Sequence, residues 1–191
     1  MSAEPRHALK YRIERGDILL SSMPKQPIRG FLLLLFFAAT APAAGNWRVG
    51  PEGVGPLRIG MTLAQIREAL HRELKEDDPH SGSEDCFYVQ SKKHLGTQFM
   101  ILDGKLARTD VTEAGIFTPE GIQVGDSEAK VRKLYGSRVR VSAHQYFDNG
   151  QYLTVLAPDR RYGTRFETDN GKVTSYYAGL ASAIEYVEGC L

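Results

Sequence analysis

Two stretches of the chain carry apolar side chains at helical spacing. Over residues 62–74 they fall three or four positions apart, at Leu63, Ile66, Leu70 and Leu74. In the second stretch they are Val131, Leu134 and Tyr135. Gly136 follows, and glycine suits the left-handed conformation that ends many helices. The spacing therefore predicts two helices that each turn an apolar stripe toward a sheet.

The same short motif precedes both predicted helices, as IGMT at residues 59–62 and VGDS at residues 124–127. Glycine permits a tight turn, and the hydroxyl of Thr62 or Ser127 caps a helix by accepting a backbone N–H. Gln65 completes a capping box with Thr62. Because Lys130 stands at the equivalent position of the second helix, we expect the second cap to be weaker.

Residues 99–111 have an Asp-Gly dipeptide between apolar runs. Asp-Gly favours the two-residue type I′ turn of a β-hairpin. A turn of this kind places Ile101 opposite Leu106 and Phe99 opposite Arg108.

Residues 165–177 repeat this pattern around an Asn-Gly dipeptide. The same turn places Thr168 opposite Val173 and Phe166 opposite Ser175. The two hairpins are therefore expected to share one register.

A further Asn-Gly pair predicts a third hairpin, with strands at about residues 140–148 and 151–157. In this register His144 faces Val155. The first half has only residues 86–90 as the matching strand.

These elements predict an α+β protein of two tandem repeats, each a helix followed by an antiparallel meander, with the helices on one face of the sheet. We expect repeat 1 at residues 44–114. Repeat 2, with a C-terminal tail, is expected at residues 115–191.

The repeated IGMT-type opening, with apolar positions at helical spacing and a meander after it, resembles a known superfamily. This superfamily joins the outer-membrane assembly lipoproteins of the BamE (SmpA/OmlA) type to the beta-lactamase inhibitor protein (BLIP). The resemblance implies a BLIP/BamE-like fold and, for tandem inhibitors, an open sheet face that binds a protein partner. The segments DCFYV (85–89) and AIEYVEGCL (183–191) are also similar to small exported proteins of Gram-negative bacteria. The lipid-bearing cysteine of the assembly lipoproteins is missing.

Residues 23–43 have the pattern of a secretory signal peptide: Lys25 and Arg29, an apolar run at 31–39, and Ala-Pro-Ala at 41–43. We expect cleavage after Ala43 or Ala44. The apolar run is shorter than the ~20 residues of a spanning helix, so no stable membrane anchor is expected. Residues 1–22 are interpreted as a non-native extension before a true start at Met23. The mature protein is expected to be periplasmic or secreted.

The mature chain of 148 residues would carry 18 Lys and Arg against 20 Asp and Glu, a net charge of −2. This balance argues against a nucleic-acid partner. Cys86 and Cys190 are the only cysteines, and an even count in an exported protein predicts a disulfide. Two separate buried thiols are the alternative interpretation.

Two motifs that could carry chemistry are interpreted structurally. The Gly-Asp-Ser block at 125–127 looks like an esterase nucleophile motif, but the first copy reads Gly-Met-Thr, so a helix cap is expected. An acidic and histidine-rich stretch fits neither a zinc pair nor an EF-hand and is expected to be a solvated loop; it contains His71, Glu73, Glu76, Asp77, Asp78 and His80. No metal or cofactor is expected.

Seven of the eight tyrosines of the mature chain lie in the second half. If helices cover only one face of the sheet, about half of these rings stand on an open face. Tyrosine with arginine is the composition of a binding surface, and ordinary strand propensity is the alternative explanation. The candidate binding residues are Tyr146, Tyr152, Tyr162, Arg165 and Tyr176.

The function expected from these observations is non-catalytic protein binding, in an envelope-assembly or inhibitor-like role. A carbohydrate-binding protein is one alternative, with exposed tyrosines stacking on sugars. The other is an envelope hydrolase that uses His144 and nearby carboxylates.

Overall fold

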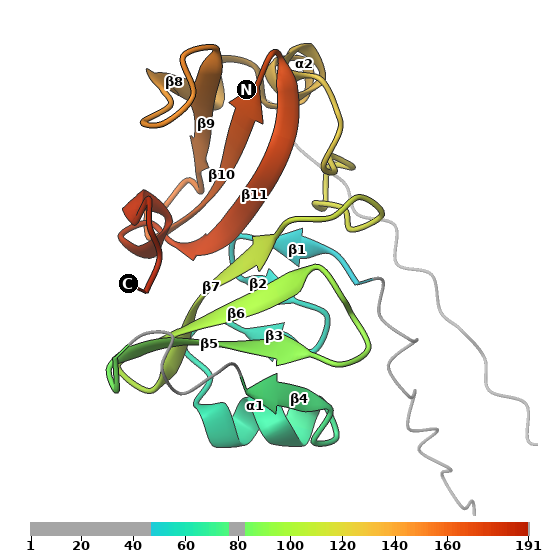
Figure 1. Cartoon of the computed structure of the whole chain (residues 1–191), viewed down its shortest axis with the longest axis vertical. Coiled ribbons are helices and arrows are strands. Elements are labelled where there is room, and N and C mark those ends of the chain that lie inside the picture. Colours follow the sequence, from blue (N-terminus) through green and yellow to red (C-terminus); the bar gives the residue numbers. More distant parts are fainter. Residues whose placement is uncertain (1–46, 77–82, 191) are drawn as a thin grey trace, which may run out of the picture. The chain divides into compact units, whose positions relative to one another are not determined.

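Eight antiparallel strands form the main sheet of the protein, in the order β4-β5-β6-β7-β11-β10-β9-β8 (Figure 1). The computed structural model describes residues 47–76 and 83–190, all within the unit Ala41–Leu191. The expected extension and signal peptide, and both expected cleavage sites, lie outside the described residues. Within the described part, no helix has the length and apolar character needed to cross a membrane.

The strands of the main sheet are β4 (Leu74–Glu76), β5 (Cys86–Ser91), β6 (Thr97–Leu102), β7 (Lys105–Val111), β8 (Val139–Ala143), β9 (Gly150–Leu156), β10 (Tyr162–Asp169) and β11 (Lys172–Leu180). A small sheet precedes them, with β1 (Val49–Gly50), β2 (Gly53–Val54) and β3 (Leu57–Arg58). The helices are α1 (Leu63–Ala69) and α2 (Glu128–Tyr135), with the 3-10 turns η1 (Gly136–Arg138) and η2 (Ala183–Glu185).

The expected fold class, two helix-plus-meander repeats of the BLIP/BamE type, is wrong. The part of the chain that the structure describes consists mainly of one eight-stranded sheet, and the two helices in that part have only 7 and 8 residues. The sheet is continuous because β7 pairs with β11, from Val111 opposite Tyr176 to Arg108 opposite Gly179. Strand pairing across such a distance in the sequence is not encoded in local periodicity, which explains the error.

The first helix is also shorter than predicted. Thr62 caps α1 and forms the expected capping box with Gln65, but the helix ends before His71 and Arg72. These two residues have φ angles of 49° and 63°, which reverse the chain without a glycine. Leu74 therefore reaches the core from strand β4 and not from the helix.

Two of the three predicted hairpin turns are present, at Asp103-Gly104 and Asn170-Gly171. Each of these hairpins has a β-bulge just beyond the first pair of its predicted register. Ile101 lies opposite Leu106 as predicted, but the bulge shifts Phe99 to face Thr109. One extra residue, Ala107, causes the shift, because Met100 already lies opposite Arg108.

The second hairpin has its bulge at the equivalent place. Thr168 lies opposite Val173 as predicted, whereas Phe166 faces Tyr176 and not Ser175. Thr174 is the extra residue here. A bulge changes the face of the sheet to which the side chains beyond it point. It therefore determines which aromatic rings lie in the core.

The predicted two-residue turn at Asn149-Gly150 is wrong. Strand β8 ends at Ala143, which lies opposite Gln151, and a longer loop, residues 144–149, connects it to β9. Gly150 belongs to the strand, where a Cβ atom would lie 2.6 Å from the carbonyl oxygen of Thr168. His144 therefore does not face Val155.

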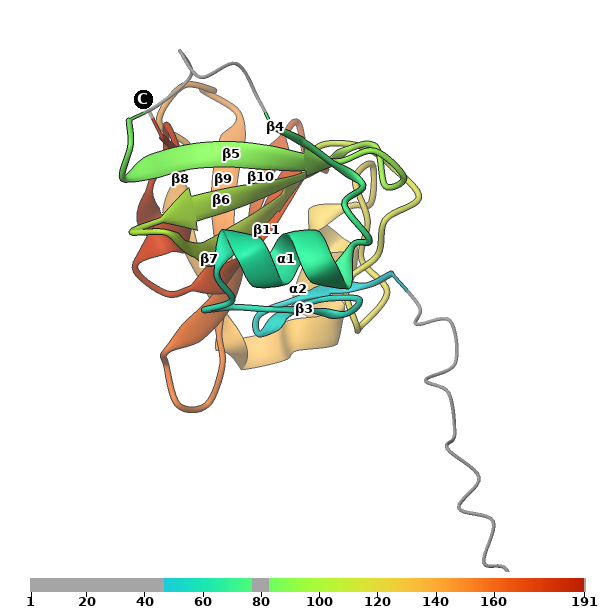
Figure 2. The same cartoon turned by 90° about the horizontal axis from the view of Figure 1, so that it is seen from below.

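The two faces of the main sheet bury different side chains. The first face holds the main apolar core, which includes Phe99 and Phe166 from the sheet, Ile66 from α1 and Val131 from α2. Figure 2 views the molecule from the side on which α1 and β3 lie in front of the sheet. The second face holds a smaller cluster, Met100, Ala107, Ala183 and Cys190. Both faces are therefore covered, at least in part.

Candidate functional site

The C-terminal tail, residues 181–190, lies on the second face of the sheet. The predicted disulfide between Cys86 and Cys190 is confirmed and links β5 to the end of the tail. The turn η2 packs against β7, β10 and β11. In Figure 1 the red tail lies beside the ends of β10 and β11. Ala183 and Ile184 are fully buried there. Gly163 lies next to this turn, where a Cβ atom would lie 2.7 Å from Ile184 Cδ1.

Arg108 on β7 connects the tail to the second face. Its Nη1 donates to the carbonyl oxygens of Ala183 (2.9 Å) and Tyr186 (2.8 Å). Its Nε and Nη2 donate to the two carboxylate oxygens of Asp110, each at 2.7 Å, and Nη2 also donates to the hydroxyl of Tyr88. All five N–H groups of this buried guanidinium are thus used, which offsets the cost of burying its charge.

Two buried tyrosines extend this polar network. The Tyr88 hydroxyl donates to Asp110 Oδ2 at 3.1 Å, and burial raises the pKa of this phenol. The Tyr177 hydroxyl donates to Glu167 Oε1 at 3.0 Å, and burial followed by the charge of Glu167 raises its pKa. Arg108 lies 4.3 Å from the centre of the Tyr177 ring. Both phenols therefore act as neutral donors to carboxylates.

A cleft of about 290 Å³ lies over this network. Its lining includes Tyr88, Arg108, Glu167 and Tyr177 from the sheet and Glu188 from the tail. Because the arginine and the tyrosines already bond to carboxylates or to the tail, these groups serve mainly to hold the tail in place.

His144 organises the loop at residues 144–149. Its Nδ1 accepts the backbone N–H groups of Tyr146 (3.1 Å) and Phe147 (3.3 Å). Its ring stacks on Phe147 and on Tyr152, with centroids 4.5 Å apart in both cases. Its Nε2 lies 3.6 Å from Glu167 Oε2 and makes no hydrogen bond within the described part of the chain.

The loop and the tail expose three large aromatic side chains. Tyr146 is 55% exposed, Phe147 45% and Tyr186 43%. The Tyr146 hydroxyl donates to the carboxylate of Glu188, which joins the loop to the tail that carries Tyr186. We call these three residues the aromatic rim.

The predicted binding residues occupy different environments. Tyr146 belongs to the aromatic rim. Tyr152 and Arg165 are buried on the second face, where Arg165 lies over the Tyr152 ring, donates to Thr154 Oγ1 at 2.9 Å and pairs with Glu185.

The remaining two predicted residues do not join this group. Tyr162 is half-buried at the start of β10, with Arg161 over its ring. Tyr176 is fully buried in the main core, and its hydroxyl donates to the carbonyl oxygen of Ile116. The bulge at Thr174 directs Tyr176 to the first face, so this residue is not part of a binding surface.

Sequence reasoning missed Phe147 and Tyr186 of the rim, and the clamp formed by Arg108 and Asp110. The Arg-Thr-Asp sequence at 108–110 did carry a signal, since residues two apart on a strand share a face.

The structure bears on the two motifs that could carry chemistry, the Gly-Asp-Ser block and the acidic and histidine-rich stretch. Ser127 caps α2 by accepting the backbone N–H of Lys130 at 3.2 Å, as expected. Over residues 47–76 and 83–190, no group of three or more His, Cys, Asp or Glu side chains could hold a metal ion. Asp77, Asp78 and His80 lie outside the described residues.

Comparisons with known proteins assign no family. No protein-family model matches this chain, and no curated protein matches it. The resemblance to the BamE and BLIP superfamily therefore remains a prediction from sequence.

Two solved structures are similar at 12% sequence identity and a TM-score of 0.43. One is an extracellular protein containing a SCP domain from Bacillus anthracis str. Ames; the match covers 63% of this chain and 43% of that one, so it spans less than half of that protein. The other is a DUF4309 family protein from Bacillus subtilis subsp. subtilis str. 168, with 70% and 88% covered. Neither likeness is close enough to assign a family or a function.

Proposed function

We propose that this protein is an exported, non-catalytic binding domain whose protein partner contacts the aromatic rim. The observation that carries the proposal is the exposure of Tyr146, Phe147 and Tyr186 on two segments joined by the Tyr146–Glu188 hydrogen bond. Aromatic side chains, tyrosine above all, supply much of the binding energy at protein interfaces.

The rim is held in place before any partner arrives. His144 fixes the loop through two backbone hydrogen bonds and two ring stacks. The disulfide and Arg108 fix the tail. A surface that is already ordered loses less conformational entropy on binding, so more of the contact energy appears as affinity.

The disulfide also supports an oxidising compartment, because such bonds persist mainly in exported proteins. Together with the signal-peptide pattern at residues 23–43, it favours the periplasm or the extracellular space as the place of action.

The arrangement of His144 argues against the hydrolase alternative. A general base must lie within hydrogen-bond reach of the substrate proton. The His144 side chain is only 3% exposed, its Nδ1 is occupied by backbone N–H groups, and aromatic rings stack on it. A role in shaping the loop accounts for all these contacts.

The proposal can be tested by photo-crosslinking in the compartment to which the cell exports the protein. A photoreactive phenylalanine derivative is placed at Tyr146, at Tyr186 or, as a control, at Leu95, which is 74% exposed. The proposal predicts the same protein adduct from positions 146 and 186 and none from position 95. Absence of adducts at both rim positions, equal adducts at position 95, or adducts with glycan alone would contradict it.

A further inference from the structure

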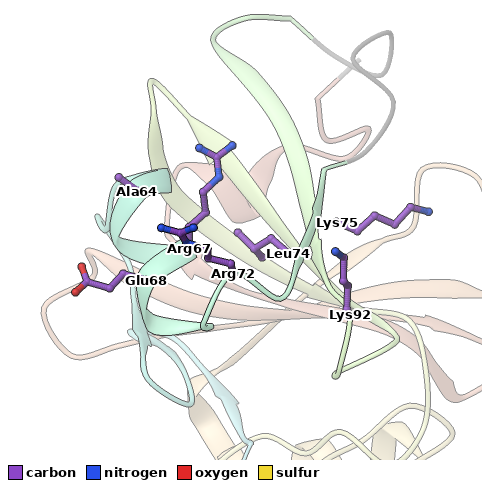
Figure 3. Close-up of a pocket in the computed structure, with 7 residues that line it drawn as sticks. All are labelled: Ala64, Arg67, Glu68, Arg72, Leu74, Lys75 and Lys92. Atoms are coloured by element: carbon purple, nitrogen blue, oxygen red, sulfur yellow. The ribbon is translucent and has the colours of Figure 1, made fainter.

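A positively charged hollow of about 960 Å³ lies between α1, β4 and the end of β5 (Figure 3). We call it the basic hollow; its lining residues are Ala64, Arg67, Glu68, Arg72, Leu74, Lys75 and Lys92. We infer that the basic hollow binds a ligand that carries two or more phosphate groups. This inference is independent of the partner proposed for the aromatic rim.

The chain reversal after α1 brings the cations together. His71 and Arg72 adopt positive φ angles, and β4 then pairs with β5, with Leu74 opposite Ser91. The backbone N–H of Lys92 donates to the carbonyl oxygen of Glu73 at 2.8 Å, which brings Lys92 beside the start of β4. A positive φ at a long side chain such as arginine is uncommon and is often found at functional positions.

Among the described residues, the charges that line the hollow are unbalanced. Four cationic side chains and one carboxylate, Glu68, line it. Arg72, Lys75 and Lys92 form no ion pair within residues 47–76 and 83–190, and all three are exposed.

Two other exposed lysines of the described chain do have carboxylate partners. Lys93 pairs with Glu73 at 2.9 Å. Lys130 pairs with Asp126 at 2.7 Å. Since like charges in one concave site repel one another and raise the local anion concentration, an anion would relieve the imbalance in the hollow.

The side chains in the hollow suit phosphate chemistry. A guanidinium such as that of Arg72 binds two phosphate oxygens at once, whereas the ammonium groups of Lys75 and Lys92 act as adjustable point charges. A volume of about 960 Å³ exceeds what one phosphate fills and lies near the upper end for small-molecule sites. The side chains of Leu74 and Ala64 add an apolar wall for the part of the ligand that carries the phosphates.

The inference can be tested by titrating the full-length protein with sodium tripolyphosphate in a calorimeter. We expect saturable binding that weakens when the ionic strength rises from about 50 to about 200 mM. The R72Q/K75Q variant should bind about tenfold more weakly or worse, because it loses two charge-assisted contacts. K92Q alone should weaken binding by a smaller factor in the same direction.

The matched control is K105Q/K133Q, which removes two exposed cations elsewhere and gives the same net charge. It should change the affinity less than about twofold if the hollow is the site. Circular dichroism checks that each variant stays folded. Absence of saturable binding by the wild type, or equal weakening in the control variant, would overturn the inference.

A second arm distinguishes the source of the phosphates. Vesicles containing cardiolipin, a lipid with two phosphate groups, are compared with vesicles of phosphatidylcholine alone. Binding to the anionic vesicles, displaced by tripolyphosphate and reduced in R72Q/K75Q, would assign the site to lipid headgroups. Tripolyphosphate binding without vesicle binding would assign it to soluble phosphorylated ligands. Vesicle binding that R72Q/K75Q and K105Q/K133Q reduce equally would contradict the site.

Discussion

The segments at residues 59–111 and 124–180 begin in the same way and end with different surfaces. Gly60 N donates to Leu106 O and Gly125 N donates to Val173 O, both at 2.8 Å. In each segment a helix start thus docks on a bulged hairpin. Because this geometry is common to both segments, it belongs to the framework and carries no information about a ligand.

The differences between the segments are chemical. After α1 the chain turns sharply into the short strand β4 and forms the basic hollow. After α2 the chain continues into β8 and the His144 loop, which carries part of the aromatic rim. The disulfide belongs to the first segment and the tail, and has no counterpart in the second. Specific surface chemistry therefore lies in residues that the two segments do not share.

The largest expected effect comes from the disulfide. It closes a loop with a sequence separation of 104 residues, so its loss should reduce the free energy of unfolding by about 4 kcal/mol. Urea unfolding with and without reductant measures this difference. The C86S/C190S variant should match the reduced wild type, and a loss below about 1 kcal/mol would contradict the structural role of the tail.

The next largest effect on stability is expected from Arg108, compared with Ser175 at the equivalent position of the second hairpin. R108M leaves Asp110 buried without its counter-charge and frees two tail carbonyls, which should cost about 3–5 kcal/mol. S175A removes only a hydroxyl that donates to Glu167, which should cost about 1 kcal/mol. Urea midpoints of the two variants test the ranking, and equal losses would show that Arg108 is not a clamp.

The third comparison is between the pH dependence of stability at two equivalent helix positions, Leu70 and Tyr135. Burial raises the pKa of the Tyr135 phenol in the folded protein above the value of about 10 expected when unfolded. As the pH rises, the Tyr135 phenol therefore loses its proton in the unfolded state before it does so in the folded state. The stabilisation that the protonated phenol gives to the folded state is complete below about pH 10 and declines above it.

Above about pH 10, the free energy of unfolding of Y135F should therefore fall less steeply with pH than that of the wild type. The two slopes should differ by about 1.4 kcal/mol per pH unit. Urea unfolding at a series of alkaline pH values measures both slopes. L70M, at the equivalent position without a titrating group, serves as the control and should keep the wild-type slope. Identical slopes in Y135F and the wild type would contradict the buried, protonated phenol.

The smallest expected stability effect separates the two helix caps. T62A removes a capping box and should cost about 1 kcal/mol or more. S127A should cost less, because Asp126 still accepts from Gln123 N and pairs with Lys130 near the same helix end. The melting temperatures of the two variants show which cap stabilises the protein more. A larger loss of stability in S127A than in T62A would contradict this interpretation.

Local signals in the sequence predicted a substantial part of the structure. The capping box at Thr62, the two hairpin turns and the Cys86–Cys190 pair each depend on residue types with strong local or chemical preferences. The end of α1 was missed because His71 and Arg72 adopt positive φ angles that glycine or asparagine would normally signal. The pairing of β7 with β11 depends on contacts distant in the sequence and was also missed.

The candidate site was predictable only in part. Tyr146 was selected and is exposed. Tyr152 is buried under the side chains of His144 and Arg165, and a bulge turns Tyr176 into the core. The exposure of Phe147 depends on the His144 loop, and that loop cannot be inferred from alternation alone. The cations of the basic hollow come from three separate segments, so only the folded chain brings them together.

The most direct test of the central claim, that the aromatic rim binds a protein, is the affinity of the crosslinked partner for Y146A and F147A. Both positions are exposed, so both variants should stay folded, with a lower melting temperature for F147A because it also loses the ring stack on His144. The account predicts about tenfold weaker binding or worse for each variant, with Y162A as the control close to wild type. Unchanged affinity in the folded Y146A and F147A variants would contradict it.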